Sequence, residues 1–455
     1  MHMPSTAPSS VASVPLMPIK ARMSALRARF GGGGHLGSVV RVMLFRAMTL
    51  VVNLTTGVLA AKYLGPDGRG ELAALLVGPQ FVGAVAMFGL PMAYIYNSKA
   101  DPESRSIYLG CALFLGLPLA LAAVAMSYAI MPFWLAGHTE ATLRTARLLL
   151  FFVPITVGIP LLTAVLDAVG RFGLSSSIQY LQPVGALIGL AGIASFGQLT
   201  ATTAAVAYIM PTVLTCLCAA WQAARFVRPA FSLAASFRNK MLSYGLGHYG
   251  VEVFGSLSSY IDQIVVVYLL PPAAVGAYVV ALSLSRVLGV MQDAIWSVLF
   301  PNIAGRGITE VVRSVTIVVQ IGVIVAAAAA LVFGLLGPYA IDWLYGQAFT
   351  SAAAPFRILL AAAVVSSAAR LFGHMFSATG RPGIVTLIEA LGVGALVAAM
   401  VLLIPTFGAS GAAAAVLAGA TVRLICVLAF MRLVLRMPLP RLIPSGADLR
   451  WARNR

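Results

Sequence analysis

Twelve long apolar stretches constrain this chain more than any motif, because each is long enough to cross a lipid bilayer. A spanning helix needs about 20 mostly apolar residues. The expected spans are residues 37–62, 71–97, 105–131, 143–167, 174–196, 200–225, 242–270, 274–300, 311–337, 352–378, 383–405 and 409–435. Only 9% of the residues are charged, whereas a soluble domain has about 25%. We therefore expect an all-α polytopic membrane protein of about 12 transmembrane helices, which excludes soluble enzymes and disordered proteins.

A polar linker at residues 226–241 divides the spans into two sets of six. It predicts an N-terminal bundle at 37–225 and a C-terminal bundle at 242–435. Residues 1–36 are rich in Pro, Ser and basic side chains, and residues 436–455 are also basic. We expect both end segments to be cytoplasmic tails, the first of them disordered.

Basic residues are distributed unevenly between the two sides of these spans. If the termini share a side with the connections after spans 2, 4, 6, 8 and 10, that side holds 21 Lys and Arg residues. The opposite side holds 4, which are Lys62, Arg69, Arg144 and Arg147. Positive residues mark the cytoplasmic side of a membrane protein, so both termini are expected in the cytoplasm. The net charge of +17 is explained by basic residues in the connections on this side of the membrane. No nucleic-acid partner is therefore expected.

Two short motifs recur in the second half of the chain. The segment AAKYLGPDGRGEL from Ala60 is matched 205 residues later by VVVYLLPPAAVGAY from Val265. A Gly-Arg-x-Gly turn follows span 4 at Gly170 and span 10 at Gly380. Each motif alone is typical of a turn that ends a helix, but their matched recurrence indicates duplication. With an even number of spans in each unit, the halves form parallel repeats, and we expect a central cavity between two six-helix bundles.

The sequence lacks the features of a nucleotide, cofactor or metal site. A P-loop needs Gly directly before its Lys, but the lysines follow Ile, Ala, Ser and Asn, at Lys20, Lys62, Lys99 and Lys240. The cysteines form no C-x-x-C pair and lie in apolar stretches, at Cys111, Cys216, Cys218 and Cys426. Small residues of this kind are typical of contacts between membrane helices. We expect no metal, no cofactor and no ATP hydrolysis.

Ionisable residues inside the apolar spans are the candidate functional residues. Each costs about 2.5–3.5 kcal/mol at a helix centre, so each should face a partner or a water-filled cavity. The candidates are Arg46, His248, Glu252, Asp262, Arg286, Asp293, Arg370 and His374. Buried ion pairs that only specify helix packing are the alternative interpretation. For Arg357, Glu389 and Arg423, which lie nearer span ends, we expect side chains that reach the membrane interface.

Span 7 is also rich in glycine. Glycine lowers helix propensity, so Gly245, Gly247 and Gly250 are candidates for a bend that opens a gate. Close packing against a neighbouring helix is the alternative, because small residues let membrane helices approach each other.

The motif YLGPDGRGEL, a second span ending in GLPMAYIY, and the Gly-Arg-x-Gly turns together resemble one known family. It is the Wzx-like polysaccharide-export flippases of the multidrug/oligosaccharidyl-lipid/polysaccharide exporter (MOP) superfamily. The resemblance covers about residues 36–436. The turn of the second half reads PPAAVG in place of the Gly-rich form, which is a departure from the pattern.

The resemblance implies a flippase in the bacterial cytoplasmic (inner) membrane that works by alternating access. Its substrate would be an undecaprenyl-pyrophosphate-linked oligosaccharide, moved from the inner to the outer leaflet. It implies a headgroup site at cationic residues of spans 1 and 8, here Arg46 and Arg286, to which we add Arg370. An ion gradient or the membrane potential would drive the cycle, with Glu252, Asp262 and Asp293 as ion or proton binders. Candidate partners are membrane lipids and the polysaccharide polymerase or export machinery.

Two other functions stay open from the sequence. A small-molecule or multidrug antiporter of the same superfamily would use the same acidic residues to hold organic cations. A membrane polymerase or ligase of glycan chains is disfavoured by the short outer connections.

Overall fold

The computed structural model describes residues 35–231, 234–289, 308–378 and 382–434. Its helices are α2 (His35–Ala86), α3 (Leu90–Ala100), α4 (Arg105–Trp134), α5 (Glu140–Leu150), α6 (Val153–Ala168), α7 (Phe172–Ser195), α8 (Ala201–Phe226), α9 (Ala235–Leu269), α10 (Pro272–Ser285), α12 (Ile308–Tyr345), α13 (Ala353–Ala378) and α14 (Pro382–Val434), with a 3₁₀ turn η1 (Gln347–Ala352). The described residues contain no strand. The predicted tails and Asp293 lie outside these residues, as do the side chains of His248 and His374.

Two of these helices are each two spans joined at a glycine. In α2, which is 52 residues long, Gly65 has φ 66° and ψ −176°; in α14, of 53 residues, Gly408 has φ 56° and ψ −131°. Positive φ is unfavourable for residues with a Cβ, so glycine is needed at both breaks. Pro66 directly follows the first break, where its fixed φ suits the start of a helix.

Nine helical segments of the described chain are long and apolar enough to cross a membrane, and two of them contain the glycine breaks. The 35-residue α9 is long enough but is not among the nine. It carries the polar residues of span 7, including Glu252 and Asp262, which lower its hydropathy. Counting both halves of α2 and α14, and adding α9, gives the twelve spans, and the predicted fold class is confirmed.

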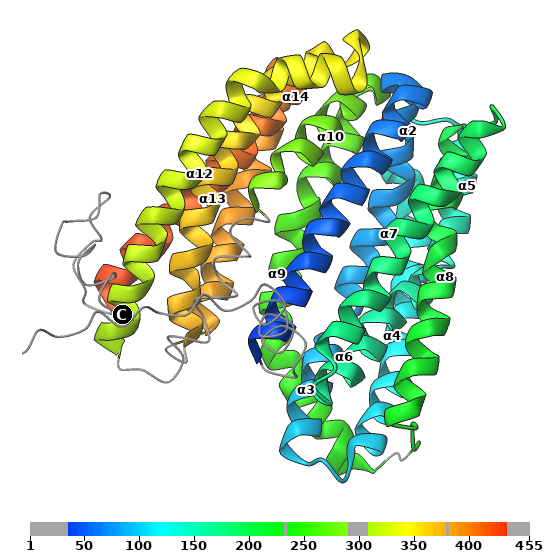
Figure 1. The fold of residues 1–455 in the computed structure, drawn as a ribbon, viewed down its shortest axis with the longest axis vertical. Helices are drawn as coiled ribbons and strands as arrows, with labels where there is room; N and C mark the ends of the chain where they lie inside the picture. Colours follow the sequence, from blue (N-terminus) through cyan, green and yellow to red (C-terminus); the bar gives the residue numbers. More distant parts are fainter. Residues whose placement is uncertain (1–34, 232–233, 290–307, 379–381, 435–455) are drawn as a thin grey trace, which may run out of the picture.

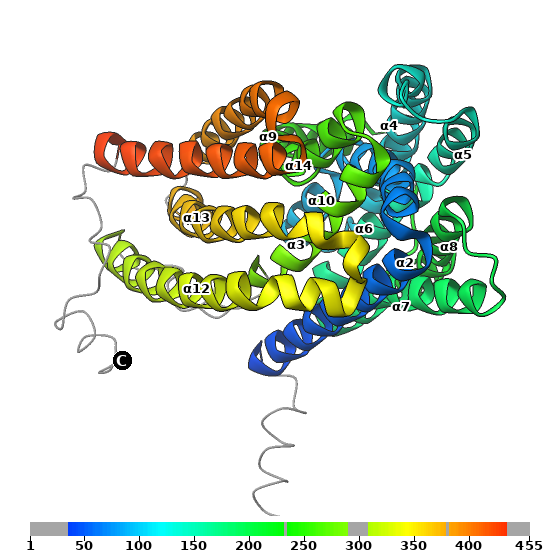
Figure 2. The same ribbon diagram turned by 90° about the horizontal axis from the view of Figure 1, so that it is seen from above.

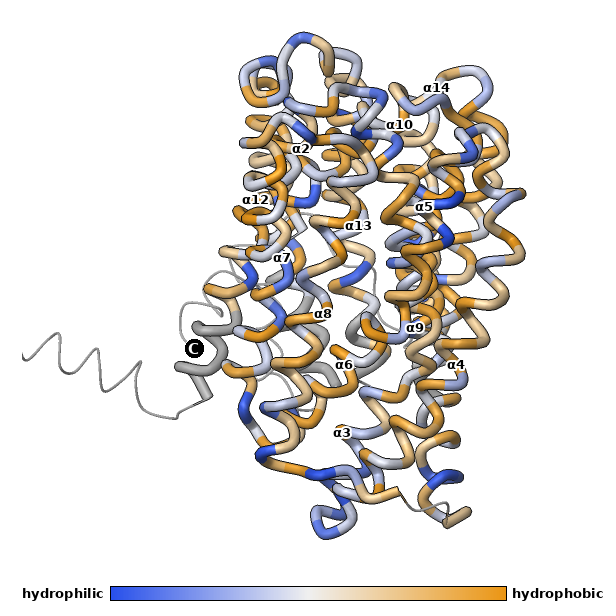
Figure 3. Tube along the Cα trace, turned by 90° about the vertical axis from the view of Figure 1, so that its right-hand side faces the viewer, coloured by the Kyte–Doolittle hydropathy of each residue, from blue (hydrophilic) through white to orange (hydrophobic). Residues whose placement is uncertain are grey.

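The helices form two groups that converge at one end. Helices α2 to α8 lie on the right of Figure 1 and α12 to α14 on the left, with α9 and α10 between them. The groups meet at the upper end and separate toward the lower end, and the view from above shows α12, α13 and α14 extending away from the rest (Figures 1 and 2). Hydrophilic residues gather mainly at the two ends of the helices, while the sides are largely hydrophobic (Figure 3).

The upper contact is made where the duplicated motifs meet. We call the contact of residues 66–77 of α2 with 264–280 of α9 and α10 the upper seam. A Cβ at Gly70 would overlap the carbonyl oxygen of Pro272, and a Cβ at Gly276 would overlap that of Pro66. Gly276 lies 206 residues after Gly70, and Pro272 lies 206 residues after Pro66. The duplicated motifs therefore pack against each other reciprocally, about a local pseudo-twofold axis.

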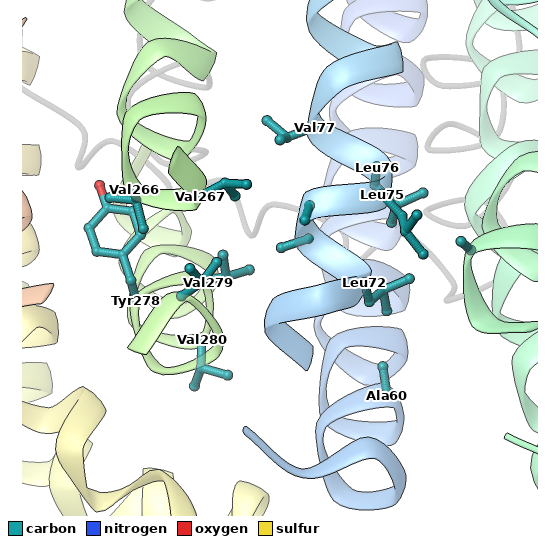
Figure 4. Close-up of a cluster of buried hydrophobic side chains, with 14 of the residues drawn as sticks. Ala60, Leu72, Leu75, Leu76, Val77, Val266, Val267, Tyr278, Val279 and Val280 are labelled. Atoms are coloured by element: carbon teal, nitrogen blue, oxygen red, sulfur yellow. The ribbon is translucent and has the colours of Figure 1, made fainter. Parts of the chain in front are cut away.

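Apolar side chains complete the upper seam. Figure 4 shows Val267 and Val279 directed toward α2 and Val77 directed toward them, while Leu75 lies on the far side of α2. These four side chains are between 1% and 7% exposed. Tyr278 lies on the side of α10 turned away from α2 (Figure 4). Trp134, at the end of α4, donates a 3.0 Å hydrogen bond to the carbonyl oxygen of Ile264. The seam excludes solvent through both backbone contact and hydrophobic packing.

Replacing Gly276 by leucine should open the upper seam, because the new side chain displaces the backbone at Pro66. We expect a cysteine introduced at Val267, which is 1% exposed, to react several-fold faster with a membrane-impermeant maleimide. The measurement uses a background with the native cysteines replaced by alanine. Gly57→Leu is the matched control on α2, because a Cβ at Gly57 would have no neighbouring atom within 4 Å. Equal labelling rates in both variants would contradict the close approach of the two backbones.

Candidate functional site: a polar centre on α9 and α10

A buried carboxylate lies near the upper end of α9. Asp262 is 5% exposed, and Tyr278 of α10, which is 0% exposed, donates a 2.8 Å hydrogen bond to its Oδ2. The guanidinium group of Arg286 lies within electrostatic range of this carboxylate. Two predicted residues, Asp262 and Arg286, are thus brought together, and Tyr278 joins them. Sequence spacing does not single out Tyr278, because an uncharged tyrosine within an apolar span carries no distinguishing signal.

Arg286 lies directly after the last residue of α10 and is exposed. Its Nη2 is 3.5 Å from the carbonyl oxygen of Ser259 on α9. Arg46 on α2 and Arg370 on α13 are exposed as well. Exposed guanidinium groups within apolar spans are tolerated at the membrane interface or in a water-filled path. All three arginine side chains therefore keep exposed surface in the structure.

The two predicted acids of α9, Glu252 and Asp262, differ in how deeply they are buried. Glu252 is half-buried in the middle of α9. Most of the α9 residues from 252 to 263 keep part of their surface exposed, and Asp262 is the buried exception. Asp262 is thus the most shielded acid of this helix.

The lower half of α9 packs on the N-terminal bundle through aromatic rings. We call this contact, of residues 85–96 with 241–249, the lower seam. Tyr96 and Tyr244 stack with ring centroids 4.2 Å apart, and Phe88 and Tyr249 lie 4.3 Å apart. Tyr249 also donates a 3.4 Å hydrogen bond to the carbonyl oxygen of Val85. Helix α9 therefore contacts the N-terminal bundle in both its lower and its upper half.

Two of the predicted gating glycines lie at close contacts of α9. A Cβ at Gly245 would come within 3.1 Å of the carbonyl oxygen of Phe88, and one at Gly250 within 3.1 Å of a methyl carbon of Thr386 on α14. Both positions thus have a packing reason for glycine. Bending of α9 at Gly245, Gly247 or Gly250 stays a prediction.

Glu389 and Arg423 form an ion pair inside the C-terminal bundle. Arg423 Nη1 is 3.1 Å from Glu389 Oε2, and Ser258 of α9 donates to the same oxygen at 2.9 Å. The side chains are 20% and 13% exposed for Glu389 and Arg423. The expectation that these two residues reach the membrane interface is wrong. They lie on opposite sides of the break at Gly408, which folds the two halves of α14 together, and their separation in sequence gives no sign of this contact.

His138 is a titratable group outside the spans whose pKa is clearly shifted. Burial lowers the pKa of His138, while the nearby carboxylate of Glu71 raises it. Its two ring nitrogens are buried without a hydrogen-bond partner. His138 follows α4 at the upper end of the N-terminal bundle and lies outside the α9 site.

Residues 39–306 match the model of a family described as polysaccharide biosynthesis proteins. This match covers more than half of the chain. The chain belongs to the polysaccharide biosynthesis protein family. No curated protein matches it by sequence.

Several solved membrane transporters share the fold of this polysaccharide biosynthesis protein. A lipid II flippase MurJ in an inward closed conformation aligns with a TM-score of 0.74 at 12% identity, covering 91% of this chain and 90% of the flippase. An inward-facing multidrug resistance MATE family transporter of the MOP superfamily gives 0.72 at 16% identity, with 87% and 97% covered. An outward-facing structure of such a transporter gives 0.63 at 17%, with 87% and 95% covered. The predicted MOP-superfamily fold is confirmed, and these structures are of a flippase and transporters, not of enzymes.

The upper seam closes one end of the described helices. There the backbone at Gly70 contacts Pro272 and the backbone at Gly276 contacts Pro66. This polysaccharide biosynthesis protein is thus closed at the end opposite to the start of α2 (Figure 1).

Breaking the Glu389–Arg423 pair should destabilise the C-terminal bundle. Arg423→Leu alone strands the Glu389 carboxylate, and we expect a loss of about 1–3 kcal/mol in unfolding free energy in detergent. The double variant Arg423→Leu/Glu389→Leu should recover most of the lost unfolding free energy. Arg144→Gln, which breaks a pair whose side chains are 73% and 74% exposed, should cost less than about 0.5 kcal/mol. Additive losses in the double variant would show that the two groups are not coupled.

Proposed function

We propose that this protein is a flippase for a lipid-linked oligosaccharide, with undecaprenyl pyrophosphate as the lipid carrier. The observation that carries the proposal is the combination of the polysaccharide biosynthesis family with the fold of a lipid II flippase. The exposed arginines within the spans supply a second line of support. A pyrophosphate crossing an apolar layer needs fixed positive charge, and guanidinium groups bind phosphate oxygens through forked hydrogen bonds.

Arg286 is the best-supported headgroup ligand. It is exposed at the end of α10, where its backbone N–H donates to the carbonyl oxygens of Leu282 and Leu284 and its Nη2 lies 3.5 Å from the carbonyl oxygen of Ser259 on α9. Arg46 and Arg370 complete the proposed set from α2 and α13. In this proposal the central cavity lies between the helices that carry these three residues.

Asp262 is the proposed coupling group. Its carboxylate is buried, is hydrogen-bonded by Tyr278 and lies within electrostatic range of Arg286. A phosphate bound at Arg286 would compete with Asp262 for the same positive charge. Uptake of a proton or cation by Asp262 would then favour binding of the substrate at Arg286, and its loss would favour release, which couples an ion gradient to transport.

The proposed site of action is the bacterial cytoplasmic membrane, with the chain termini in the cytoplasm. The excess of Lys and Arg on that side supports this orientation. The upper seam would then face the outer leaflet, where the flipped oligosaccharide is released to the polymerase or export machinery.

A multidrug antiporter is the second candidate, favoured by the likeness to MATE transporters. An antiporter of organic cations needs acidic groups in contact with its ligand. Asp262 is instead buried against Tyr278, and the exposed groups named above are arginines. These features favour an anionic substrate.

Loss of positive charge at the proposed headgroup site should abolish export. We expect Arg286→Gln and Arg46→Gln each to reduce surface polysaccharide about tenfold or more in cells, because each removes charge-assisted bonds to phosphate. Immunoblotting of membranes checks that the protein is present. Arg144→Gln removes an equal charge outside the site and should export normally. Normal export by both site variants would refute the headgroup assignment.

Neutralising Asp262 should uncouple transport from its driving gradient. With Asp262→Asn, flipping of a fluorescent lipid-linked sugar in proteoliposomes should no longer respond to an imposed proton or sodium gradient. The exposed Asp342, bonded to Thr350, provides the control Asp342→Asn. An unchanged gradient response in Asp262→Asn would remove Asp262 from the mechanism.

A further inference from the structure

Arg69 is a buried cation without an acidic partner among the residues that the structure describes. It lies on α2 just after the break at Gly65, and it is 8% exposed. Its Nε is buried and has no hydrogen-bond partner. Within the described ranges, no carboxylate lies within 4.0 Å of its guanidinium group. The sequence places Arg69 on the turn between spans 1 and 2, but α2 is helical there and the residue is buried beside the upper seam.

Two tyrosines from different helices interact electrostatically with this cation. Tyr208 of α8 and Tyr345 at the end of α12 both lie within electrostatic range of Arg69. Tyr345 is 4% exposed, and its hydroxyl is also buried without a hydrogen-bond partner. The acid close by in the chain, Glu71, lies within electrostatic range of His138. Among the described residues, the cluster thus holds unsatisfied donors from both bundles and no acidic acceptor.

Such an arrangement is costly unless a ligand completes it. A buried charge and a buried hydroxyl each lose their hydration without gaining a partner. Guanidinium and phenol groups are both donors, so the ligand that satisfies them is an anion with several acceptor oxygens. The apolar neighbours, among them Phe349 beside the ring of Tyr345, supply no competing acceptor.

We propose that Arg69 and Tyr345, with Tyr208 beside them, form a second anion site next to the upper seam that takes a phosphate or pyrophosphate group. The inference rests on the proposed flippase function and extends it. The adjacent Gly70 is part of the reciprocal contact with Pro272, so opening the seam exposes Arg69. The headgroup that leaves Arg286 is then received at the releasing side of the membrane. Without the anion, the uncompensated charge raises the free energy of the sealed state.

The first test measures binding of inorganic pyrophosphate to the purified full-length protein by isothermal titration. Gly276→Leu, which opens the seam, should bind pyrophosphate, and adding Arg69→Gln should weaken that binding about tenfold or more. Arg144→Gln in the same background should bind as Gly276→Leu does. Equal affinity with and without Arg69 would overturn the proposal. Because the readout is binding, it is independent of the export assay that tests the flippase function.

A second arm identifies the source of the phosphate. Farnesyl pyrophosphate in detergent carries the same headgroup on a lipid chain. If it binds through Arg69 at a concentration where free pyrophosphate does not, the site takes a lipid headgroup. If free pyrophosphate binds equally well, the site takes a soluble anion. Failure of both ligands to depend on Arg69 excludes the site.

Thermal unfolding keeps the proposal testable if Gly276→Leu does not fold. Arg69→Leu removes an uncompensated charge, so the unliganded variant should melt about 2 °C or more above the parent protein. Pyrophosphate should raise the melting temperature of the parent protein and not that of Arg69→Leu. Tyr345→Phe should reduce the increase that pyrophosphate causes. An arginine with a purely structural role predicts the reverse: a lower melting temperature for Arg69→Leu and equal stabilisation by pyrophosphate.

Discussion

Compensation of charge in an apolar medium is the constraint on which the rest of this structure depends. The chain has few charged residues, and those inside the spans fall into distinct environments. Glu389 and Arg423 neutralise each other within one bundle. Asp262 is held by Tyr278 near Arg286, whereas Arg69 has no acidic partner among the described residues. A charge that has a close partner of opposite sign has a structural role. A charge without such a partner is available to a ligand or to a proton.

Helix α9 links these charges to the movement of the two bundles. It carries Asp262 and Ser258, which connect it to α10 and to α14. Its lower half contacts the N-terminal bundle through Tyr244 and Tyr249. A rocking motion of one bundle against the other must therefore change the contacts that α9 makes in these two seams. A change of charge at Asp262 is therefore well placed to bias that motion, since the helix that carries it belongs to both seams.

The architecture is predictable from the sequence because apolar length and repeated motifs are local signals. The spans, the break at Gly65-Pro66 and the duplicated turns all follow from neighbouring residues. The site depends on contacts that no local signal records. A fall in hydropathy points to a turn at Arg69, and a position toward a span end points to the interface for Glu389, yet both side chains lie inside the protein. In both cases a glycine break with positive φ redirects the helix, which determines what the side chain meets.

The reciprocal contact in the upper seam shows that the duplicated halves kept their backbone geometry but not their chemistry. At the offset of 206 residues that relates Gly70 to Gly276, Asp262 corresponds to Thr56, Tyr278 to Leu72 and Arg69 to Val275. All six of these side chains are less than one-tenth exposed. The first half therefore contributes the cation and the second half the acid with its tyrosine. Because the repeats are parallel, the pseudo-twofold axis relates contacts at the upper end only to other contacts at that end. Residues that differ between the repeats can therefore give the two halves different roles. The buried polar residues at these three related positions are such differences, because an apolar residue stands at two of the matching sites and an uncharged threonine at the third.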